Sequence, residues 1–160
     1  MEEELSVILL PLKENKGNNL NYYLEYMRQI RNNYKDYMTR FRDEITPEMQ
    51  KNWYENLPEN INPYIFIACE HGVVIYPFGY GMIQYEDGKS LLTGAIEDRY
   101  RGKGYGRKLF LKLIDLSEEM DNKIFLEVLD TNTVALNLYK SLGFKFCDQK
   151  NNVITMELKK

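Results

Sequence analysis

The first third of the chain contains one apolar run followed by two amphipathic segments. Residues 5–12 are short, aliphatic and partly β-branched, which predicts a strand. From Leu20 onward, apolar side chains recur every three or four positions, a spacing typical of an amphipathic helix. Thr46 and Pro47 then supply an N-cap and a first-turn proline for a second helix, which we expect to end before Pro58. The residues of this helix expected to face the core are Met49, Trp53 and Leu57.

Three apolar runs follow, separated by two segments with the composition of hairpin turns. Pro77 and Gly79 interrupt the second run, which predicts that its first part is a loop or lies at an edge of the sheet. The three strands are expected at residues 64–69, 73–85 and 90–96.

The last third alternates helices with strands. Apolar side chains after Gly106 follow helical spacing as far as Met120, and residues 123–129 predict a buried strand. Asn132 can cap a further helix that ends at Gly143, and a terminal hairpin follows. The whole chain, residues 1–160, therefore predicts one α+β domain with a mixed, mainly antiparallel sheet and about four helices.

Composition and charge exclude several classes of protein. The chain has 160 residues, of which 44% are hydrophobic and 28% charged, as in an ordinary globular domain. Its 21 Lys and Arg against 24 Asp and Glu give a net charge of -3, which argues against binding nucleic acid through phosphates. No apolar run approaches a membrane span, and the acidic start lacks the features of a signal peptide. We therefore expect a cytoplasmic protein without nucleic-acid or membrane partners.

Metal-ligating and nucleophilic residues are scarce. Cys69 and Cys147 have no metal-ligand spacing, and His71 is the only histidine in the chain. His71 lies in a turn-like tripeptide, so a Ser-His-Asp or Cys-His site has no suitable base. We expect no metal site.

The segment from Arg99 to Lys108 carries the densest chemical signal. Glycines alternate with other residues from Gly102 to Gly106, directly before a predicted helix. Glycine lets the backbone approach a ligand closely, and the N–H groups at a helix start attract anions. Surrounding basic side chains concentrate positive charge in a chain that is acidic overall. The segment is therefore a candidate cradle for a pyrophosphate.

Three interpretations compete for this segment. The simplest is a glycine-rich turn with solvated charges. The second is a dinucleotide-binding loop, because the acids Glu127 and Asp130 follow at a suitable distance, but too few residues come after Gly106 to complete that fold. A Walker phosphate loop fails, because no Gly-Lys-Ser or Gly-Lys-Thr follows these glycines. The third takes the segment together with a later motif.

Two motifs occur in a fixed order along the chain. Arg101-Gly102-Lys103-Gly104-Tyr105-Gly106 has the form R/Q-x-x-G-x-G/A and follows the strand residue Ile96. The pattern N-x-x-A-x-x-L-Y-x-x-x-G-F is present in full at Asn132, Ala135, Leu138, Tyr139, Gly143 and Phe144. With both motifs, residues 63–158 resemble the GCN5-related N-acetyltransferase (GNAT) family. The segment from Ile45 to Trp53, with the strand that follows it, resembles the members that acetylate ribosomal-protein N-termini or amino sugars. One departure is Asp98, where many members have proline.

The resemblance implies an acetyl-CoA-dependent enzyme on a sheet whose fourth and fifth strands splay to admit pantetheine. A strand edge suits the two pantetheine amides, and the glycine loop suits the pyrophosphate. The residues expected to bind the cosubstrate are Ala95, Ile96, Arg101, Gly102, Lys103, Gly104, Tyr105, Gly106, Arg107 and Asn132.

The resemblance also implies direct attack of an amine on the thioester in a ternary complex. Tyr139 is the candidate acid that protonates the departing thiolate, and a plain core aromatic is the alternative. Glu127 is the candidate base, since strand alternation places it among apolar residues that would raise its pKa. A salt-bridged or solvated Glu127 is the alternative, in which case a water chain or Glu97 would remove the proton.

The acceptor is the least determined part of the interpretation. In the family that the chain resembles, the first two helices and the loop near the third strand usually shape the acceptor pocket. We favour an amino sugar or another small amine; the alternatives are a peptide N-terminus or a non-catalytic acyl-CoA-binding module. Relatives are frequently dimers, so the resemblance allows a homodimer. The residues expected near the acceptor are Tyr22, Tyr26, Trp53, Phe78, Tyr80 and Gln84.

Overall fold

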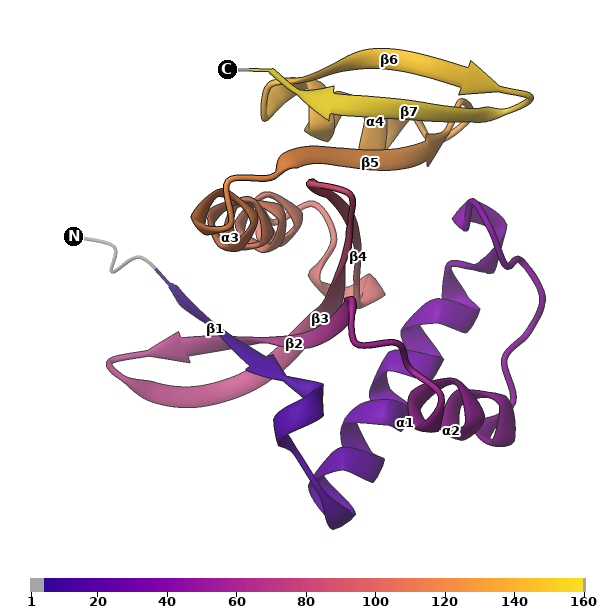
Figure 1. Ribbon diagram of the computed structural model, residues 1–160. Coiled ribbons are helices and arrows are strands. Elements are labelled where there is room, and N and C mark those ends of the chain that lie inside the picture. The colour runs from indigo at the N-terminus through magenta and orange to yellow at the C-terminus, as the bar shows by residue number, and fades with distance from the viewer. Residues whose placement is uncertain (1–4, 160) are drawn as a thin grey trace.

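The computed structural model describes residues 5–159, which form seven strands and four α-helices (Figure 1). The strands are β1 (Ser6–Pro11), β2 (Ile61–Glu70), β3 (Val73–Glu86), β4 (Lys89–Ile96), β5 (Lys123–Leu129), β6 (Phe144–Lys150) and β7 (Val153–Leu158). The helices are α1 (Gly17–Asn33), α2 (Pro47–Glu55), α3 (Tyr105–Glu119) and α4 (Thr133–Ser141), with 3-10 turns η1 (Leu12–Glu14), η2 (Lys35–Tyr37) and η3 (Asp98–Tyr100). The predicted α+β class and order of elements are confirmed. Within these residues, no helix is long and apolar enough to cross a membrane.

The seven strands form one sheet in the order β1-β2-β3-β4-β5-β7-β6. Neighbouring strands are antiparallel except β4 and β5, which are parallel and are connected through α3. A parallel pair needs a crossover connection, and the helix supplies it. The mixed, mainly antiparallel sheet is as predicted.

β4 and β5 separate part-way along their length. Their pairing runs from Lys89 opposite Lys123 to Leu92 opposite Leu126 and then stops. Beyond this point β4 pairs only with β3, and β5 pairs only with β7. The splay between the fourth and fifth strands is therefore confirmed.

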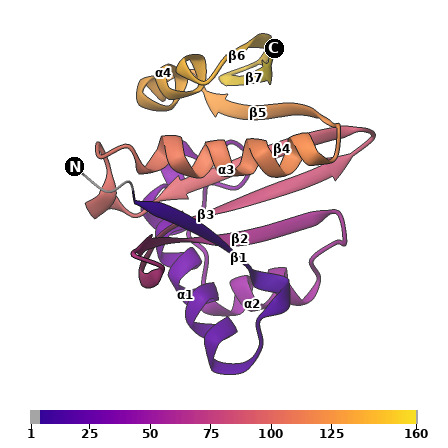
Figure 2. The same cartoon turned by 90° about the vertical axis from the view of Figure 1, so that its left-hand side faces the viewer.

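Helices cover both faces of the sheet. α1 and α2 lie side by side on one face, and α3 lies on the other (Figures 1 and 2). Phe66, Leu109 and Tyr139 belong to the hydrophobic cluster on the α3 and α4 side. Met27 and Tyr80 belong to the cluster on the α1 and α2 side. The two clusters make β2, β3 and β4 a central layer that is buried from both sides.

The predicted helix caps are present. The Thr46 side chain accepts a hydrogen bond from the Met49 N–H at 3.2 Å, and the Asn132 side chain accepts one from the Ala135 N–H at 3.3 Å. Each satisfies a backbone donor that the first turn of the helix leaves without a partner. Gly143 follows α4 with a φ of 102°, as expected for the residue after a helix end.

The inner face of α2 differs from the prediction. Met49 is exposed, and Leu57 lies beyond the end of the helix. The inward positions are instead Gln50, which is buried, and Trp53 and Tyr54, which pack against the α1-side cluster. These three residues stand at positions i, i+3 and i+4, which share one face of a helix. Because the first of them is polar, the hydrophobic pattern did not indicate that this face is the buried one.

β3 is continuous, so the predicted loop before Gly79 is wrong, although the edge interpretation is confirmed. Residues before Gly79 pair with β2 but not with β4. A β-bulge leaves Phe78 without a partner residue on β2, because Phe66 pairs with Gly79 and Ile67 with Pro77. The bulge shifts the alternation of faces along the strand.

Candidate active site

The separation of β4 from β5 leaves one side of β4 without a neighbouring strand. The stretch from Thr93 to Ile96 is hydrogen-bonded to β3 only. A free strand edge presents N–H and C=O groups at regular intervals, which is the arrangement that binds extended amide-containing ligands. Ala95 and Ile96, both predicted to bind the cosubstrate, lie on this free stretch.

The glycine loop lies between η3 and α3. Gly102 and Gly104 have φ values of 72° and 86°, in the left-handed region that glycine adopts without strain. No atom lies within 4 Å of a Cβ built at either position, so the loop backbone is open to an approaching ligand. Gly104 is the N-cap of α3, so the first N–H groups of the helix open beside the loop.

Gly106 brings the two sequence motifs together in space. A Cβ built there would lie 3.0 Å from Ile96 Cδ1 and 3.3 Å from Leu138 Cδ2. The end of β4, the first turn of α3 and the inner face of α4 therefore meet at this glycine. Arg107 adds a second link between the helices, because its Nη1 donates a hydrogen bond to Ser141 Oγ at 3.1 Å.

Aromatic side chains support the loop. The Tyr105 ring lies 4.8 Å from the Phe78 ring, and its hydroxyl is 2.5 Å from the Tyr76 hydroxyl. The Tyr76 ring stacks on Tyr100 at 5.1 Å. Burial, followed by the hydrogen bond to Tyr76, raises the pKa of Tyr105 to about 12, so its phenol stays neutral. The Tyr105 side chain thus anchors the loop, and its backbone is the part that a ligand can use.

Arg101 connects the loop to α1. Its Nε donates a hydrogen bond to the hydroxyl of Tyr34, the residue that follows α1, and its guanidinium lies 4.1 Å from the centre of that ring. Asp98 also pairs with Arg101 at 3.4 Å. The position where many GNAT members have proline therefore supplies a carboxylate that holds the loop arginine.

Tyr139 lies in an aromatic and apolar environment. Its ring makes edge-on contacts with Phe110 at 5.0 Å and Phe144 at 6.1 Å. Burial alone raises the pKa of Tyr139 well above its ordinary value. The phenol therefore keeps its proton at neutral pH, which is the state that a proton donor needs.

Glu127 is paired with an arginine. β5 buries Ile124, Leu126 and Val128 on the α3 side, so Glu127 lies on the opposite face, the side of α1. There Nη2 of Arg40, from the segment between α1 and α2, bonds to Glu127 Oε1. The strand alternation predicted apolar surroundings for Glu127. In the structure its partner is instead Arg40, which lies in a segment where the sequence shows no helical or strand period.

Glu97, the alternative base, lies at the end of β4. Its Oε2 accepts a hydrogen bond from the Tyr26 hydroxyl at 2.7 Å, and its Oε1 is 2.6 Å from Arg99 Nε. Burial and the contact with Glu97 raise the pKa of Tyr26 far above its ordinary value. Both candidate carboxylates therefore have an arginine partner.

Comparison with known proteins identifies the family. The family model described as Acetyltransferase (GNAT) family matches residues 27–144, which include both motifs, the free edge of β4 and Glu127. The chain belongs to the GNAT family.

The relatives found by sequence similarity match only a short segment of the chain. Over 53 residues the chain is 38% identical to a spermine/spermidine N(1)-acetyltransferase of Bacillus subtilis, and 38% identical to the N-alpha-acetyltransferase RimI of Mycobacterium tuberculosis. The matches cover 32% and 33% of this chain and 35% and 32% of those proteins, respectively. A third relative, the uncharacterized protein ML0378 of Mycobacterium leprae, is 42% identical over 53 residues, which are 33% of this chain and 14% of that protein. The match therefore spans at most 35% of each of these relatives' length.

Solved structures with the same fold cover nearly the whole chain. A domain from Methanocaldococcus jannaschii has a TM-score of 0.80 at 19% identity, covering 96% of this chain and 98% of that one. A variant of the spermidine N-acetyltransferase SpeG of Vibrio cholerae has a TM-score of 0.74 at 16% identity, covering 94% and 92%. At these identities the likeness shows the fold.

The residues present fit the acetyl-CoA that GNAT enzymes use. Open backbone at Gly102 and Gly104, the start of α3, and the exposed cations Arg101, Lys103 and Arg107 suit the phosphates. The free edge of β4 suits the pantetheine amides. Asn132 Oδ1 accepts the hydrogen bond that caps α4. The predicted contact of Asn132 with pantetheine would therefore use an oxygen that already has this partner.

The structure separates the predicted acceptor residues into groups. Tyr26 and Tyr80 face the α1 side, close to the free part of β4: Tyr26 bonds to Glu97, and Tyr80 pairs with Ala95. Trp53 packs at the margin of the same cluster. Gln84 lies on the joined part of β3, about 13 Å along the strand from Tyr80. Tyr22 is largely exposed.

Phe78 is not brought to the α1 face. The bulge in β3 turns its side chain into the α3-side cluster, against Tyr105. In this position Phe78 supports the glycine loop, on the face of the sheet opposite Tyr80.

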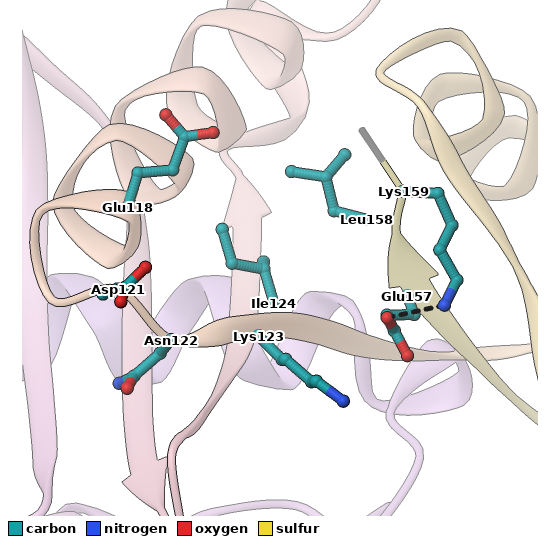
Figure 3. Close-up of a pocket in the computed structure, with 8 residues that line it drawn as sticks. All are labelled: Glu118, Asp121, Asn122, Lys123, Ile124, Glu157, Leu158 and Lys159. Atoms are coloured by element: carbon teal, nitrogen blue, oxygen red, sulfur yellow. Dashed lines mark hydrogen bonds and ion pairs between the residues drawn. The ribbon is translucent and has the colours of Figure 1, made fainter.

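Sequence reasoning missed Arg40, Tyr34 and the pairing of Arg99 with Glu97. Arg40 lies in irregular backbone, where no hydrophobic period indicates a partner. Tyr34 continues the helical spacing of α1, but that spacing does not indicate its contact with Arg101. Neither cavity described by the structure includes these residues: the larger, of about 340 Å³, lies at the opposite end of β5, between α3 and β7 (Figure 3).

Replacing Gly104 with alanine tests the loop. Left-handed backbone costs an alanine about 1–2 kcal/mol, and the open space around the Cβ leaves this strain as the direct effect. We expect the Kd for acetyl-CoA, measured by calorimetry, to rise about tenfold. Gly88→Ala is the matched control: it has a φ of 74° and the same open space, but it lies in the β3–β4 turn. Equal affinity in the two variants would contradict a role of the loop in binding.

Proposed function

We propose that this GNAT protein transfers the acetyl group of acetyl-CoA directly to a primary amine in a ternary complex, with an amino sugar or another small amine as the favoured acceptor. One observation carries the proposal: the unpaired edge of β4, the glycine loop and the inner face of α4 converge at Gly106.

The two cysteines, Cys69 and Cys147, are free thiols, which suits the reducing cytoplasm where we expect the protein to act.

The chemistry needs a neutral amine and a proton for the leaving sulfur. Acetyl-CoA supplies an activated thioester, whose C–S bond breaks as the new N–C bond forms. The protein has to accept a proton from the amine and deliver one to the thiolate. Tyr139 is the proposed donor because it lies on α4, whose inner face meets the end of β4 at Gly106, and because a phenol carries its proton at neutral pH.

Tyr139→Phe tests the acid. The described residues offer the Tyr139 hydroxyl no hydrogen-bond partner, so the change should leave the free energy of unfolding nearly the same. We expect kcat to fall about 10²-fold while the Kd for acetyl-CoA is unchanged. Tyr54→Phe, which removes a hydrogen bond to the Leu12 carbonyl far from the loop, is the control and should keep its kcat. An unchanged kcat in Tyr139→Phe would refute the assignment.

Glu127 is the proposed proton acceptor for the amine. It lies on the α1 face of β5, immediately past the point where β5 leaves β4, so it faces the acceptor side of the gap. Its side chain is 19% exposed and its partner Arg40 is 66% exposed. An ion pair whose cation is largely solvated is weak, so an incoming ammonium can take the place of the guanidinium.

Glu127→Gln tests the base. A carboxamide cannot accept the proton, so we expect kcat/KM for the amine to fall about 10²-fold and the ascending limb of the pH–rate profile to change. Glu97→Gln is examined in parallel because it removes the other carboxylate on this face. If only Glu97→Gln alters the profile, Glu97 is the base; if neither does, a water chain removes the proton.

Arg40→Gln tests the exchange of cations. Without the guanidinium, the acceptor ammonium no longer competes for Glu127, so KM for the amine should fall about three- to tenfold. Arg42→Gln is the matched control, because Arg42 lies in the same segment but donates to the Asp36 carbonyl. A rise in KM for Arg40→Gln would show that Arg40 binds the acceptor instead of yielding to it.

Release of free CoA thiol with a panel of amines distinguishes catalysis from simple binding of acyl-CoA. The panel comprises amino sugars, polyamines and a peptide with a free N-terminus, which are the acceptor classes suggested by the motifs and the relatives. Mass spectrometry of the product identifies the acetylated amine.

A further inference from the structure

Among the described residues, Arg31 on α1 differs from every other arginine of the chain. The sequence contains seven arginines. Within residues 5–159 the Arg31 guanidinium makes no hydrogen bond and no ion pair. A guanidinium that is partly removed from water is normally paired, because an unpaired charge is costly to bury. The six arginines that do have a partner are Arg28, Arg40, Arg42, Arg99, Arg101 and Arg107.

Helical spacing places Arg31 on the inner side of α1. It follows the fully buried Met27 by four residues and precedes Tyr34 by three, and such positions share one face of a helix. The Arg31 side chain is partly buried. Its Nε is buried without a partner, whereas its two Nη atoms are neither buried nor hydrogen-bonded within residues 5–159. The end of the guanidinium is therefore accessible to a ligand, while the part nearer the helix is enclosed by the protein.

The C-terminal half of α1 lies over the end of β4 and the glycine loop. The helix crosses the face of the sheet opposite α3 and contacts β3 and β4 (Figures 1 and 2). Tyr26 bonds to Glu97 at the end of β4, and Tyr34 bonds to Arg101 of the loop. Arg31 comes between these two tyrosines, so it belongs to the part of α1 that covers the site.

Tyr80 links Arg31 to the free part of β4. Its side chain is 1% exposed, and its hydroxyl has no hydrogen-bond partner in the described residues. Burial raises the pKa of Tyr80 to about 12, and the positive charge of Arg31 opposes this rise, so the guanidinium lies near the phenol. Tyr80 pairs with Ala95, on the stretch of β4 that has separated from β5. Arg31 is therefore a cation on the acceptor side of the β4–β5 gap.

The other charges on this side leave Arg31 uncompensated. A single positive charge is balanced by a ligand group with one negative charge. A carboxylate has that charge, and its two oxygens lie in one plane, as the N–H donors of a guanidinium do. A phosphate would bring about two negative charges against one cation. The nearby carboxylates already have arginine partners, in the pairs Glu97–Arg99, Glu127–Arg40 and Asp98–Arg101.

We propose that the acceptor amine carries a carboxylate, which Arg31 binds through its Nη atoms. The inference rests on the proposed function, because the amine of the same molecule is the group that approaches Glu127. A molecule with both charges spans the gap, from Arg31 above β3 and β4 to Glu127 on β5. The acceptor is thereby narrowed from any small amine to an amino acid or an amino sugar that bears a carboxylate.

Calorimetric titration of the full chain in the presence of CoA tests this preference. CoA has no acetyl group to transfer, so binding is measured without turnover. The probes are the ω-amino acids from glycine to 5-aminopentanoate, each compared with its own primary amide, and 2-amino-2-deoxyglucuronate compared with glucosamine. Each comparison removes the negative charge and keeps the amine. We expect the best acid to bind at least tenfold more tightly than its neutral counterpart. Failure of every acid to exceed its counterpart would overturn the proposal.

Arg31→Gln locates the carboxylate. The affinity for the best acid should fall about tenfold, to that of its neutral counterpart, while the affinity for the counterpart stays the same. A merely structural role of Arg31 would lower both affinities alike. Arg31→Lys keeps the charge but not the paired donors, so it should lower the preference at least threefold. Arg42→Gln is the matched control, because Arg42 donates to the Asp36 carbonyl, and it should keep the full preference. A preference that neither Arg31 variant reduces would refute the site.

Release of CoA thiol from acetyl-CoA with the same probes separates this inference from the proposed function. If the neutral amines are acetylated with the same kcat/KM as the acids, the inference fails and the acetyltransferase function stands. If no probe releases thiol but the acids still bind more tightly through Arg31, the proposed transfer to these amines fails and the carboxylate site stands.

Discussion

The parting of β4 from β5 is the constraint on which the rest of the site depends. A sheet normally satisfies the backbone of each inner strand from both sides, and here the second half of β4 is satisfied from one side only. Such an edge inside a sheet persists only if neighbouring elements hold the two strands apart. α3 and α4 do this on one face, because the first turn of α3 is wedged between Ile96 and Leu138 at Gly106.

The same parting orders the chemistry around it. The glycine loop and the start of α3 lie at one end of the free edge, and Glu97 marks the end of β4. Across the gap, Glu127 projects from β5 toward the α1 face. The segment between α1 and α2 reaches both sides, since Tyr34 contacts the loop arginine and Arg40 contacts β5. Groups that are distant in sequence are thus positioned by one local break in strand pairing.

Much of this arrangement could be predicted from the sequence, because it rests on local signals. The glycine loop and the cap at Asn132 follow from short motifs, and the buried position of Tyr139 on α4 follows from helical spacing. The partners of Glu127 and Arg101 could not be predicted, since Arg40 comes from irregular backbone and the helical spacing of Tyr34 does not indicate its contact with Arg101. The placement of Phe78 on the α3 side could not be predicted either, because a bulge interrupts the alternation of side chains along β3. Gln50 escaped notice because an inward polar residue does not belong to an apolar pattern.

The bulge in β3 has a consequence for how sequences with this fold can vary. Because of the one extra residue, Phe78 and Tyr80 lie on opposite faces of β3 and pack in different hydrophobic clusters. Phe78 lies beneath the glycine loop, and Tyr80 lies beside α1. Removing the extra residue would restore regular alternation and bring positions two apart, such as those of Phe78 and Tyr80, to the same face, whereas a substitution would alter only one compartment. Chain length at this point is therefore under stricter constraint than residue type.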